Sequence, residues 1–80
     1  MTVTVRFFAA ASAAAGTEEE KFQPGTLQEI VDAALHKYGE PMEIIMPACS
    51  FLLAGVAMND RDAVVPAGST LDVLPPFAGG

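Results

Sequence analysis

The sequence has little of what several large classes of functional site require. It contains a single cysteine, Cys49, so no disulfide can form within the chain and no four-cysteine metal or iron–sulfur site is possible. It has only four Lys or Arg residues against ten Asp or Glu, which gives a net charge of −6. Because nucleic-acid binding needs clustered basic side chains, we expect no nucleic-acid partner, and a basic protein partner is favoured instead.

Long apolar runs are lacking as well. The apolar stretch 8–15 is far too short to span a bilayer, and the first residues do not have the basic and apolar segments of a secretory signal. We therefore expect no membrane insertion and a cytoplasmic protein. Eighty residues predict one domain with a thin core, yet 51% of them are apolar. Part of the apolar surface is therefore expected to face a partner.

Candidates for side-chain catalysis are few. His36 is the only histidine and falls in the last turn of a predicted helix, where a positive charge suits the helix dipole. Cys49 has no basic neighbour in the sequence that would lower its pKa, and we interpret it as a plain buried residue. Asp60 and Asp62 fit a solvated turn better than a cation site. We therefore expect no side-chain active site, no bound cofactor and no metal.

The first strand carries an aromatic residue on its polar face. Alternating residues predict a strand over 2–9 in which Val3, Val5 and Phe7 face the core. Phe8 then points the other way, among residues that seek water. The sequence therefore predicts an aromatic side chain outside the core.

The best-defined element is a helix between Thr26 and Gly39. Thr26 and Glu29 form a capping-box pattern, and apolar residues then recur at helical spacing along one face: Leu27, Ile30, Val31, Ala34, Leu35 and Tyr38. Gly39 is expected to close this helix, and Pro41 is expected to prevent its resumption.

The other segments are predicted with less detail. The alanine-rich range 9–15 is interpreted as a loop, with a turn of helix ended by Gly16 as the alternative. The range 17–23 is predicted to be an exposed edge strand because it contains three glutamates. Pro24-Gly25 is predicted to be a break after this strand. A short helical turn within 42–50 is expected to cover an open side of the core.

The second half of the chain predicts three more strands. The first covers 51–58 and is apolar enough to be mostly buried. The second covers 63–65 and follows a turn over 59–62. The third covers 69–74, with Leu71 and Val73 facing inward and Asp72 and Leu74 facing outward. The order is therefore β-β-α-β-β-β. This order predicts an α+β fold with one main helix packed on one face of a mixed sheet of about five strands.

The first and last strands of such a sheet are expected to lie side by side and parallel at its centre. Phe8 and Leu74 would then form one apolar patch at the root of the C-terminal segment, and Phe77 would extend it. Aromatic anchors of this kind commonly carry much of the energy of a protein contact. We therefore expect a partner protein to bind there.

The sequence given ends in Gly79 and Gly80, after Leu74-Pro75-Pro76-Phe77-Ala78. Glycines without a Cβ fit a narrow channel, and the two prolines would hold a projecting tail stiff over ~20 Å at ~3.3 Å per residue. We expect a domain over 1–74 and an extended, reactive tail over 75–80. A terminal carboxylate is ionised at pH 7, so another enzyme must activate it, most cheaply with ATP.

Four segments carry a resemblance to a known family. They are Val5-Arg6-Phe7-Phe8-Ala9, the Gly16 that follows, Val56-Ala57-Met58-Asn59, and Asp72-Val73-Leu74-Pro75-Pro76-Phe77-Ala78-Gly79-Gly80. In order and spacing the chain resembles the MoaD/ThiS family of ubiquitin-like sulfur carriers, and within it the small subunits of molybdopterin synthase. The ending Pro-Pro-x-x-Gly-Gly is the most specific part, while the region 40–50 matches no family pattern.

The resemblance implies a β-grasp fold and a reaction cycle. An adenylyltransferase of the ubiquitin-activating type uses ATP to adenylate Gly80, and sulfur from a persulfide donor then gives a thiocarboxylate. The tail enters the active site of the large synthase subunit, where sulfur passes to a cyclic pyranopterin monophosphate in molybdenum cofactor biosynthesis. The chain would be the sulfur-donating, non-catalytic subunit of a heterotetramer.

The family's functional residues map onto this chain at its two ends. Gly79 and Gly80 are the expected reactive residues, and the expected partner-binding residues are Phe8, Leu74, Pro75, Pro76, Phe77 and Ala78. Other readings stay open: a sulfur carrier for thiamine, cysteine or tungsten-pterin synthesis, a ubiquitin-like protein modifier, or a non-covalent interaction domain.

Overall fold

The computed structural model describes residues 1–76. Five strands form one sheet in the order β2-β1-β7-β4-β5, and β3 and β6 form a second, two-stranded sheet. The elements in chain order are β1 Val3–Phe7, α1 Ala10–Ala15, β2 Glu19–Phe22, β3 Gly25–Thr26, α2 Leu27–Tyr38, α3 Glu40–Ile45, the 3-10 helix η1 Met46–Ala48, β4 Ser50–Leu53, β5 Val56–Ala57, β6 Val64–Val65 and β7 Thr70–Leu74.

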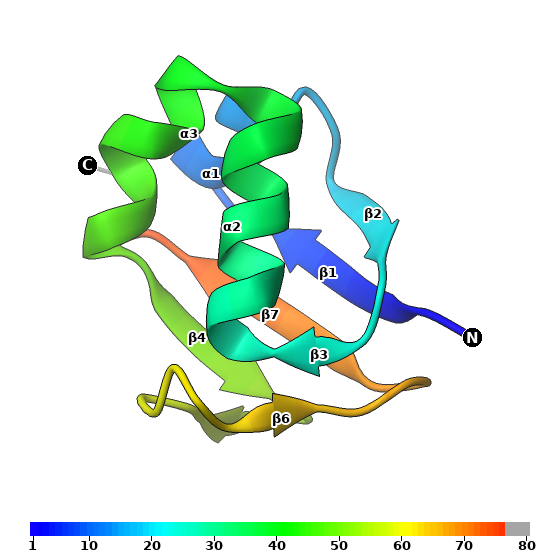
Figure 1. The fold of residues 1–80 in the computed structure, drawn as a ribbon. Coiled ribbons are helices and arrows are strands. Elements are labelled where there is room, and N and C mark those ends of the chain that lie inside the picture. Colours follow the sequence, from blue (N-terminus) through cyan, green and yellow to red (C-terminus); the bar gives the residue numbers. More distant parts are fainter. Residues whose placement is uncertain (77–80) are drawn as a thin grey trace.

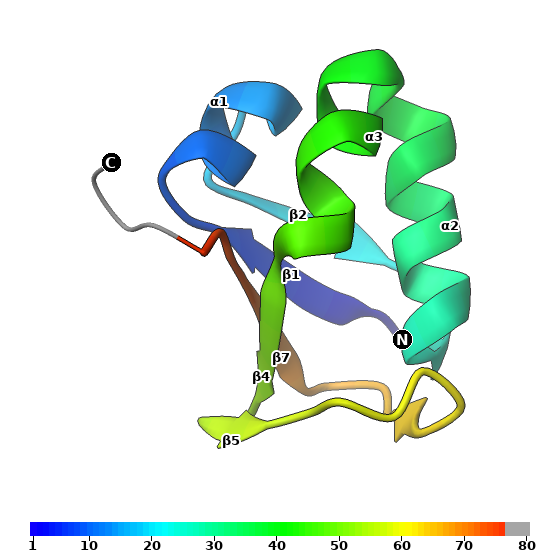
Figure 2. The same ribbon diagram turned by 90° about the vertical axis from the view of Figure 1, so that its left-hand side faces the viewer.

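The first and last strands, β1 and β7, are parallel neighbours within the larger sheet. Strand β2 pairs antiparallel with β1 at one edge, and β4 pairs antiparallel with β7 on the other side. Helix α2 crosses one face of this sheet, and α1 and α3 lie on the same side (Figures 1 and 2). The predicted fold class is confirmed: the protein has a β-grasp fold with a mixed five-stranded sheet and one main helix.

The core lies between α2 and the sheet, where the strand parity predicted it. Val3, Val5 and Phe7 of β1 are buried, and so are Leu71 and Val73 of β7. Four residues of α2 are buried opposite them: Leu27, Ile30, Val31 and Ala34. Since each of these strands alternates, its other residues are placed on the open face of the sheet.

The predicted capping box starts α2. The Thr26 hydroxyl accepts the backbone N–H of Glu29 at 3.1 Å, and the Glu29 carboxylate accepts the backbone N–H of Thr26 at 2.8 Å. At the other end Gly39 has a φ of 79°, and its N–H donates to the carbonyl of Leu35. Both helix ends are therefore set by local sequence, as expected.

The range 9–15 was interpreted from the sequence as a loop, but the structure has a helix there. Helix α1 covers six alanine-rich residues, and Gly16 ends it in the left-handed conformation with a φ of 74°. Alanine has the highest helix propensity, and the buried Ala11 joins the hydrophobic core. The loop interpretation was wrong, and the alternative of a short helix ended by Gly16 is confirmed.

The expectation that Pro41 prevents further helix was also wrong. Helix α3 begins directly after Gly39 with Pro41 in its first turn, where a missing N–H costs no intrahelical hydrogen bond. The segment does cover the core as expected, because Met42 and Met46 are buried. It is longer than one turn, since Pro47 lies within η1.

The range 51–58 is a hairpin rather than one buried strand. Ala54 and Gly55 both have positive φ, 51° and 82°, as the central residues of a type I′ turn require. Strand β5 after this turn is a sheet edge, and its Val56 is 69% exposed. The predicted break at Pro24-Gly25 also contains the short strand β3, which pairs antiparallel with β6.

Candidate interaction site at the end of β7

Phe8 lies next to the end of β7. Its backbone N–H donates to the carbonyl of Val73 at 3.2 Å, which continues the parallel β1–β7 ladder beyond the pair Phe7 and Val73. Because Phe7 and Val73 are buried on the helix side, Phe8 and Leu74 are placed on the open face. Phe8 is 37% exposed and Leu74 is half-buried. The structure thus places these two predicted site residues at neighbouring positions.

The remaining predicted site residues follow β7. Pro75 is half-buried and Pro76 is exposed. The other four, Phe77, Ala78, Gly79 and Gly80, lie outside the described residues. Their roles, and the division of the chain into a domain over 1–74 and a tail over 75–80, stay predictions.

The Arg6 side chain contacts the Phe8 ring on the open face of the sheet. The Arg6 guanidinium lies 5.3 Å from the centre of the Phe8 ring, within cation–π range. The same guanidinium donates to both carboxylate oxygens of Asp72, from Nε at 2.8 Å and from an Nη at 3.2 Å. This hydrogen bond and the negative charge of Asp72 raise the pKa of Arg6. The pairing positions the guanidinium beside the exposed ring, although it lies in solvent and adds little stability.

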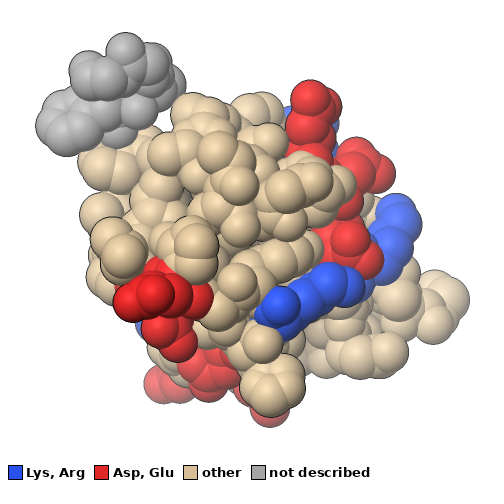
Figure 3. Space-filling model, turned by 90° about the horizontal axis from the view of Figure 1, so that it is seen from above, with Lys and Arg blue, Asp and Glu red and all other residues tan. Residues whose placement is uncertain are grey.

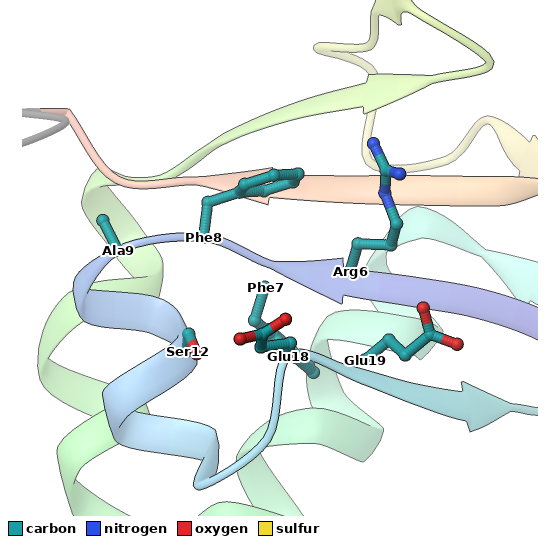
Figure 4. Close-up of a pocket in the computed structure, with 7 residues that line it drawn as sticks. All are labelled: Arg6, Phe7, Phe8, Ala9, Ser12, Glu18 and Glu19. Atoms are coloured by element: carbon teal, nitrogen blue, oxygen red, sulfur yellow. The ribbon is translucent and has the colours of Figure 1, made fainter.

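A shallow pocket of about 350 Å³ borders Phe8 on its other side, between α1 and β2 (Figure 4). Glu18, Glu19, Ser12 and Arg6 contribute its polar lining. No ion pair of either glutamate occurs within residues 1–76, and Arg6 is paired with Asp72. With two carboxylates against one guanidinium, this border of the Phe8 surface is acidic on balance, which suits the basic partner that the net charge favours.

The other candidate groups lie away from this surface or are held unreactive. The Cys49 thiol is half-buried and donates to the carbonyl of Ile45 at 3.3 Å, and burial raises its pKa, so the nucleophilic thiolate is disfavoured. His36 is exposed in the last turn of α2. Asp60 accepts the backbone N–H of Asp62 at 2.9 Å, as in an ordinary turn.

Residues 1–76 contain neither a candidate metal site nor a candidate membrane span. No group of three or more His, Cys, Asp or Glu side chains in this range is arranged to hold a metal ion. None of the helices described has the length and apolarity needed to cross a membrane.

One exposed apolar residue near this site was not predicted from the sequence. Ile44 on α3 is 76% exposed, and it lines a groove with Pro75 and Pro76. A signal was available, because Ile44 falls outside the helical spacing of the core-facing Met42 and Met46. It was overlooked because α3 itself was not resolved from the sequence.

The fold and this site define a small ubiquitin-like β-grasp protein with an exposed aromatic beside the root of its C-terminal segment. No protein-family model matches the sequence. No curated protein matches it significantly.

Solved structures do match it over nearly the whole chain. One is a putative molybdopterin converting factor subunit 1 from Pyrococcus furiosus, with a TM-score of 0.83 and 17% identity over 96% of this chain and 99% of that chain. A chain in the structure of a complex of subunits 1 and 2 of molybdopterin-converting factor from Helicobacter pylori also matches. Its TM-score is 0.73 and its identity is 25%, over 100% of this chain and 100% of that chain.

A third match is small archaeal modifier protein 1 (SAMP1) from Methanosarcina acetivorans, with a TM-score of 0.83 and 20% identity over 99% of this chain and 96% of that chain. The chain therefore has the MoaD/ThiS-like form of the ubiquitin-like fold, as the sequence resemblance predicted.

Proposed function

We propose that this protein is a sulfur carrier and the small subunit of molybdopterin synthase. The likeness to molybdopterin converting factor subunit 1 and to SAMP1 supports a sulfur-carrier or ubiquitin-like role. The observation that carries the proposal is the parallel pairing of β1 with β7, which sets the exposed Phe8 beside the strand that leads to Gly80. A partner bound at Phe8 would lie within the ~20 Å reach of the segment that follows Leu74.

The chemistry takes place at the carboxylate of Gly80. An oxygen of the ionised carboxylate attacks the α-phosphorus of ATP on an activating enzyme of the ubiquitin-activating type, and pyrophosphate leaves. The outer sulfur of a persulfide then displaces AMP and forms an acyl disulfide. A thiol then attacks the donor's sulfur of this intermediate and forms a disulfide with it, which releases a thiocarboxylate on Gly80. Glycine at the last two positions has no Cβ to obstruct the channel in which these steps occur.

The sulfurated chain delivers its sulfur as part of a complex. The Helicobacter pylori structure contains subunits 1 and 2 together, which supports a large subunit as the stable partner of this chain. Phe8, Leu74 and the residues from Pro75 onward bind the large subunit, and Gly79-Gly80 enters its active site. There the thiocarboxylate sulfur passes to a cyclic pyranopterin monophosphate. No cofactor is held by this chain, since ATP is bound by the activating partner.

Intact mass spectrometry tests the first half of this cycle. The protein is incubated with ATP, the activating enzyme and a persulfide donor, after its untreated mass has verified that the chain ends at Gly80. We expect one oxygen-for-sulfur exchange, placed on Gly80 by fragmentation. The matched control is the chain without Gly80, which must show none. A wild-type chain that never gains sulfur under these conditions would contradict the proposal.

A protein-modifier role is the second candidate, and the likeness to SAMP1 favours it. In that case the activated Gly80 carbonyl would be attacked by a lysine amine of a target, with loss of AMP and formation of an isopeptide bond. Covalent adducts in cell extracts that vanish on deletion of Gly80 would support this role. A stable, non-covalent complex with the large subunit, without adducts, would support the sulfur carrier.

A further inference from the structure

A second apolar surface borders the root of the C-terminal segment, on the helical side of the sheet. It is a groove of about 380 Å³ between α1, α3 with η1, and the residues after β7, and we call it the helix-side groove. Six apolar residues line it: Ala10, Ile44, Ile45, Ala48, Pro75 and Pro76. The surface over the helices shows a wide area without charged side chains, with both acidic and basic groups at its edges (Figure 3). An apolar occupant fits such a groove.

The exposed apolar side chains of the described chain divide between its two ends. Residues Ser50 and Leu53 of β4 pair with Leu74 and Leu71 of β7, so β5, which follows β4, lies at the end of the sheet opposite the exit of β7 (Figure 2). Strand β6, which leads into the start of β7 through residues 66–69, lies at the same end as β5 (Figure 1). The exposed valines of β5 and β6 are therefore remote from this exit. At the exit itself the large exposed side chains are Phe8 and Ile44, and Ile44 is twice as exposed, at 76% against 37%.

The Phe8 surface alone is too small for a lasting complex. A large side chain can bury ~200 Å², so a 37% exposed Phe8 offers ~75 Å² of contact. A standard protein interface buries ~800 Å² on each partner, about ten times more. A stable subunit interface at this end must therefore include further surface, and the helix-side groove offers apolar surface that adjoins the end of β7 through Pro75 and Pro76.

The short distance that the chain can span from Pro76 to Gly80 also favours a contact that includes the groove. Residues 77–80 span at most ~14 Å beyond Pro76 at ~3.5 Å per residue. An interface of ~800 Å² corresponds to a disc of ~16 Å radius. A contact of this size centred on Gly80 therefore reaches Pro76, which lines the groove.

We propose that the helix-side groove is the second half of the docking surface for the large synthase subunit, and that an apolar side chain of that subunit inserts between Ile44 and Pro75-Pro76. The inference rests on the proposed function. It assigns the groove to the large subunit rather than to the activating enzyme because a permanent complex needs more buried apolar area than a transient encounter. Helix α3 thereby contributes to binding of the large subunit through residues that the sequence resemblance did not cover.

The test compares two exposed aliphatic side chains at opposite ends of the molecule. Ile44→Asp is compared with the matched control Val64→Asp, since Val64 is 64% exposed on β6. Titration calorimetry against the large subunit is expected to show a Kd raised about 10- to 100-fold for Ile44→Asp. The Val64→Asp variant is expected to bind like wild type. Ile44→Ala, which keeps α3 intact, is expected to give a smaller loss in the same direction and replaces Ile44→Asp if thermal melting shows that variant unfolded.

Each other outcome has a defined meaning. A wild-type Kd for folded Ile44→Asp, or an equal loss for both variants, would overturn the groove assignment. Slower sulfur loading of Gly80 with unchanged binding of the large subunit would assign the groove to the activating enzyme and also overturn it. In all these cases normal sulfur exchange at wild-type Gly80 would leave the proposed function standing. A wild-type chain that neither gains sulfur nor binds the large subunit would refute both proposals.

Discussion

Replacement of Phe8 by aspartate separates docking from folding. The ring is 37% exposed, so ~75 Å² of apolar surface is available to a partner, which at ~25 cal/mol/Å² contributes ~2 kcal/mol to association. A carboxylate at this position would also be buried close to Glu18 and Glu19, while the neighbouring Arg6 guanidinium is already paired with Asp72. We therefore expect Phe8→Asp to weaken binding of the large subunit by ~2–4 kcal/mol, or ~30- to 1000-fold in Kd.

The same substitution should leave the fold intact. The hydrogen bond from Phe8 to Val73 uses the backbone N–H, so it survives the change of side chain. The folded state loses the contact between the ring and the Arg6 guanidinium, worth ~0.5–1 kcal/mol at an exposed site. The ring is also about two-thirds buried within the chain, so its removal loses ~125 Å² of packed apolar surface, or up to ~3 kcal/mol. Denaturant unfolding followed by circular dichroism is expected to show a cooperative transition with a free energy of unfolding lower by up to ~3–4 kcal/mol.

Titration calorimetry of Phe8→Asp, Phe8→Ala and wild type against the large subunit completes the assay. Phe8→Ala removes the ring without adding a charge, so its loss should be near the ~2 kcal/mol of the area term. An unfolded Phe8→Asp chain would mean that Phe8 belongs to the core and that the strand-parity argument is wrong. A folded variant with unchanged Kd would mean that this surface does not bind the partner.

Three further predictions concern the fold and its one thiol. Thr26→Ala removes the hydroxyl that caps α2 and should lower the free energy of unfolding by ~1 kcal/mol, or ~4–8 °C in Tm; an unchanged melt would contradict the cap. Met42→Ala should cost ~2–5 kcal/mol in a urea titration, because α3 covers the core through this buried side chain; a loss below ~1 kcal/mol would mean that α3 is dispensable. Burial raises the pKa of Cys49, so its alkylation by iodoacetamide should be slower than that of the urea-unfolded chain at pH 8. Because the folded state then holds this proton longer than the unfolded state, stability should fall as the pH rises above the ordinary thiol pKa. Equal alkylation rates in the two states would contradict this.

The sequence predicted those elements in which local signals agree with tertiary packing. The alternation of Val3, Val5 and Phe7 found the core face of β1 and, by exclusion, the exposed Phe8. The capping box at Thr26 and the glycine at position 39 set both ends of α2. In these segments propensity, period and burial all favour one structure.

The failures occurred where one residue type permits two structures. Pro41 can break a helix or begin one. Only the burial of the Met42 side chain on the core side of α3 decides between these two roles. The turn at Ala54-Gly55 lacks the Asn-Gly or Asp-Gly pair that marks such hairpins, so the apolar run looked like one strand. The site was predicted only in part for the same reason, since Ile44 gains its significance from the position of α3 beside Pro75.

A single-turnover reaction follows the transfer of sulfur from Gly80 to the product. The thiocarboxylated protein is mixed with the large subunit and a cyclic pyranopterin monophosphate, and the sulfur content of Gly80 and the yield of dithiolene product are measured at successive times. The account predicts that Gly80 returns to an ordinary carboxylate as product appears, with each sulfur atom in the product matched by one lost from the chain. Product formed at the same rate by a chain that lacks Gly80, or sulfur retained on Gly80 while product accumulates, would contradict it.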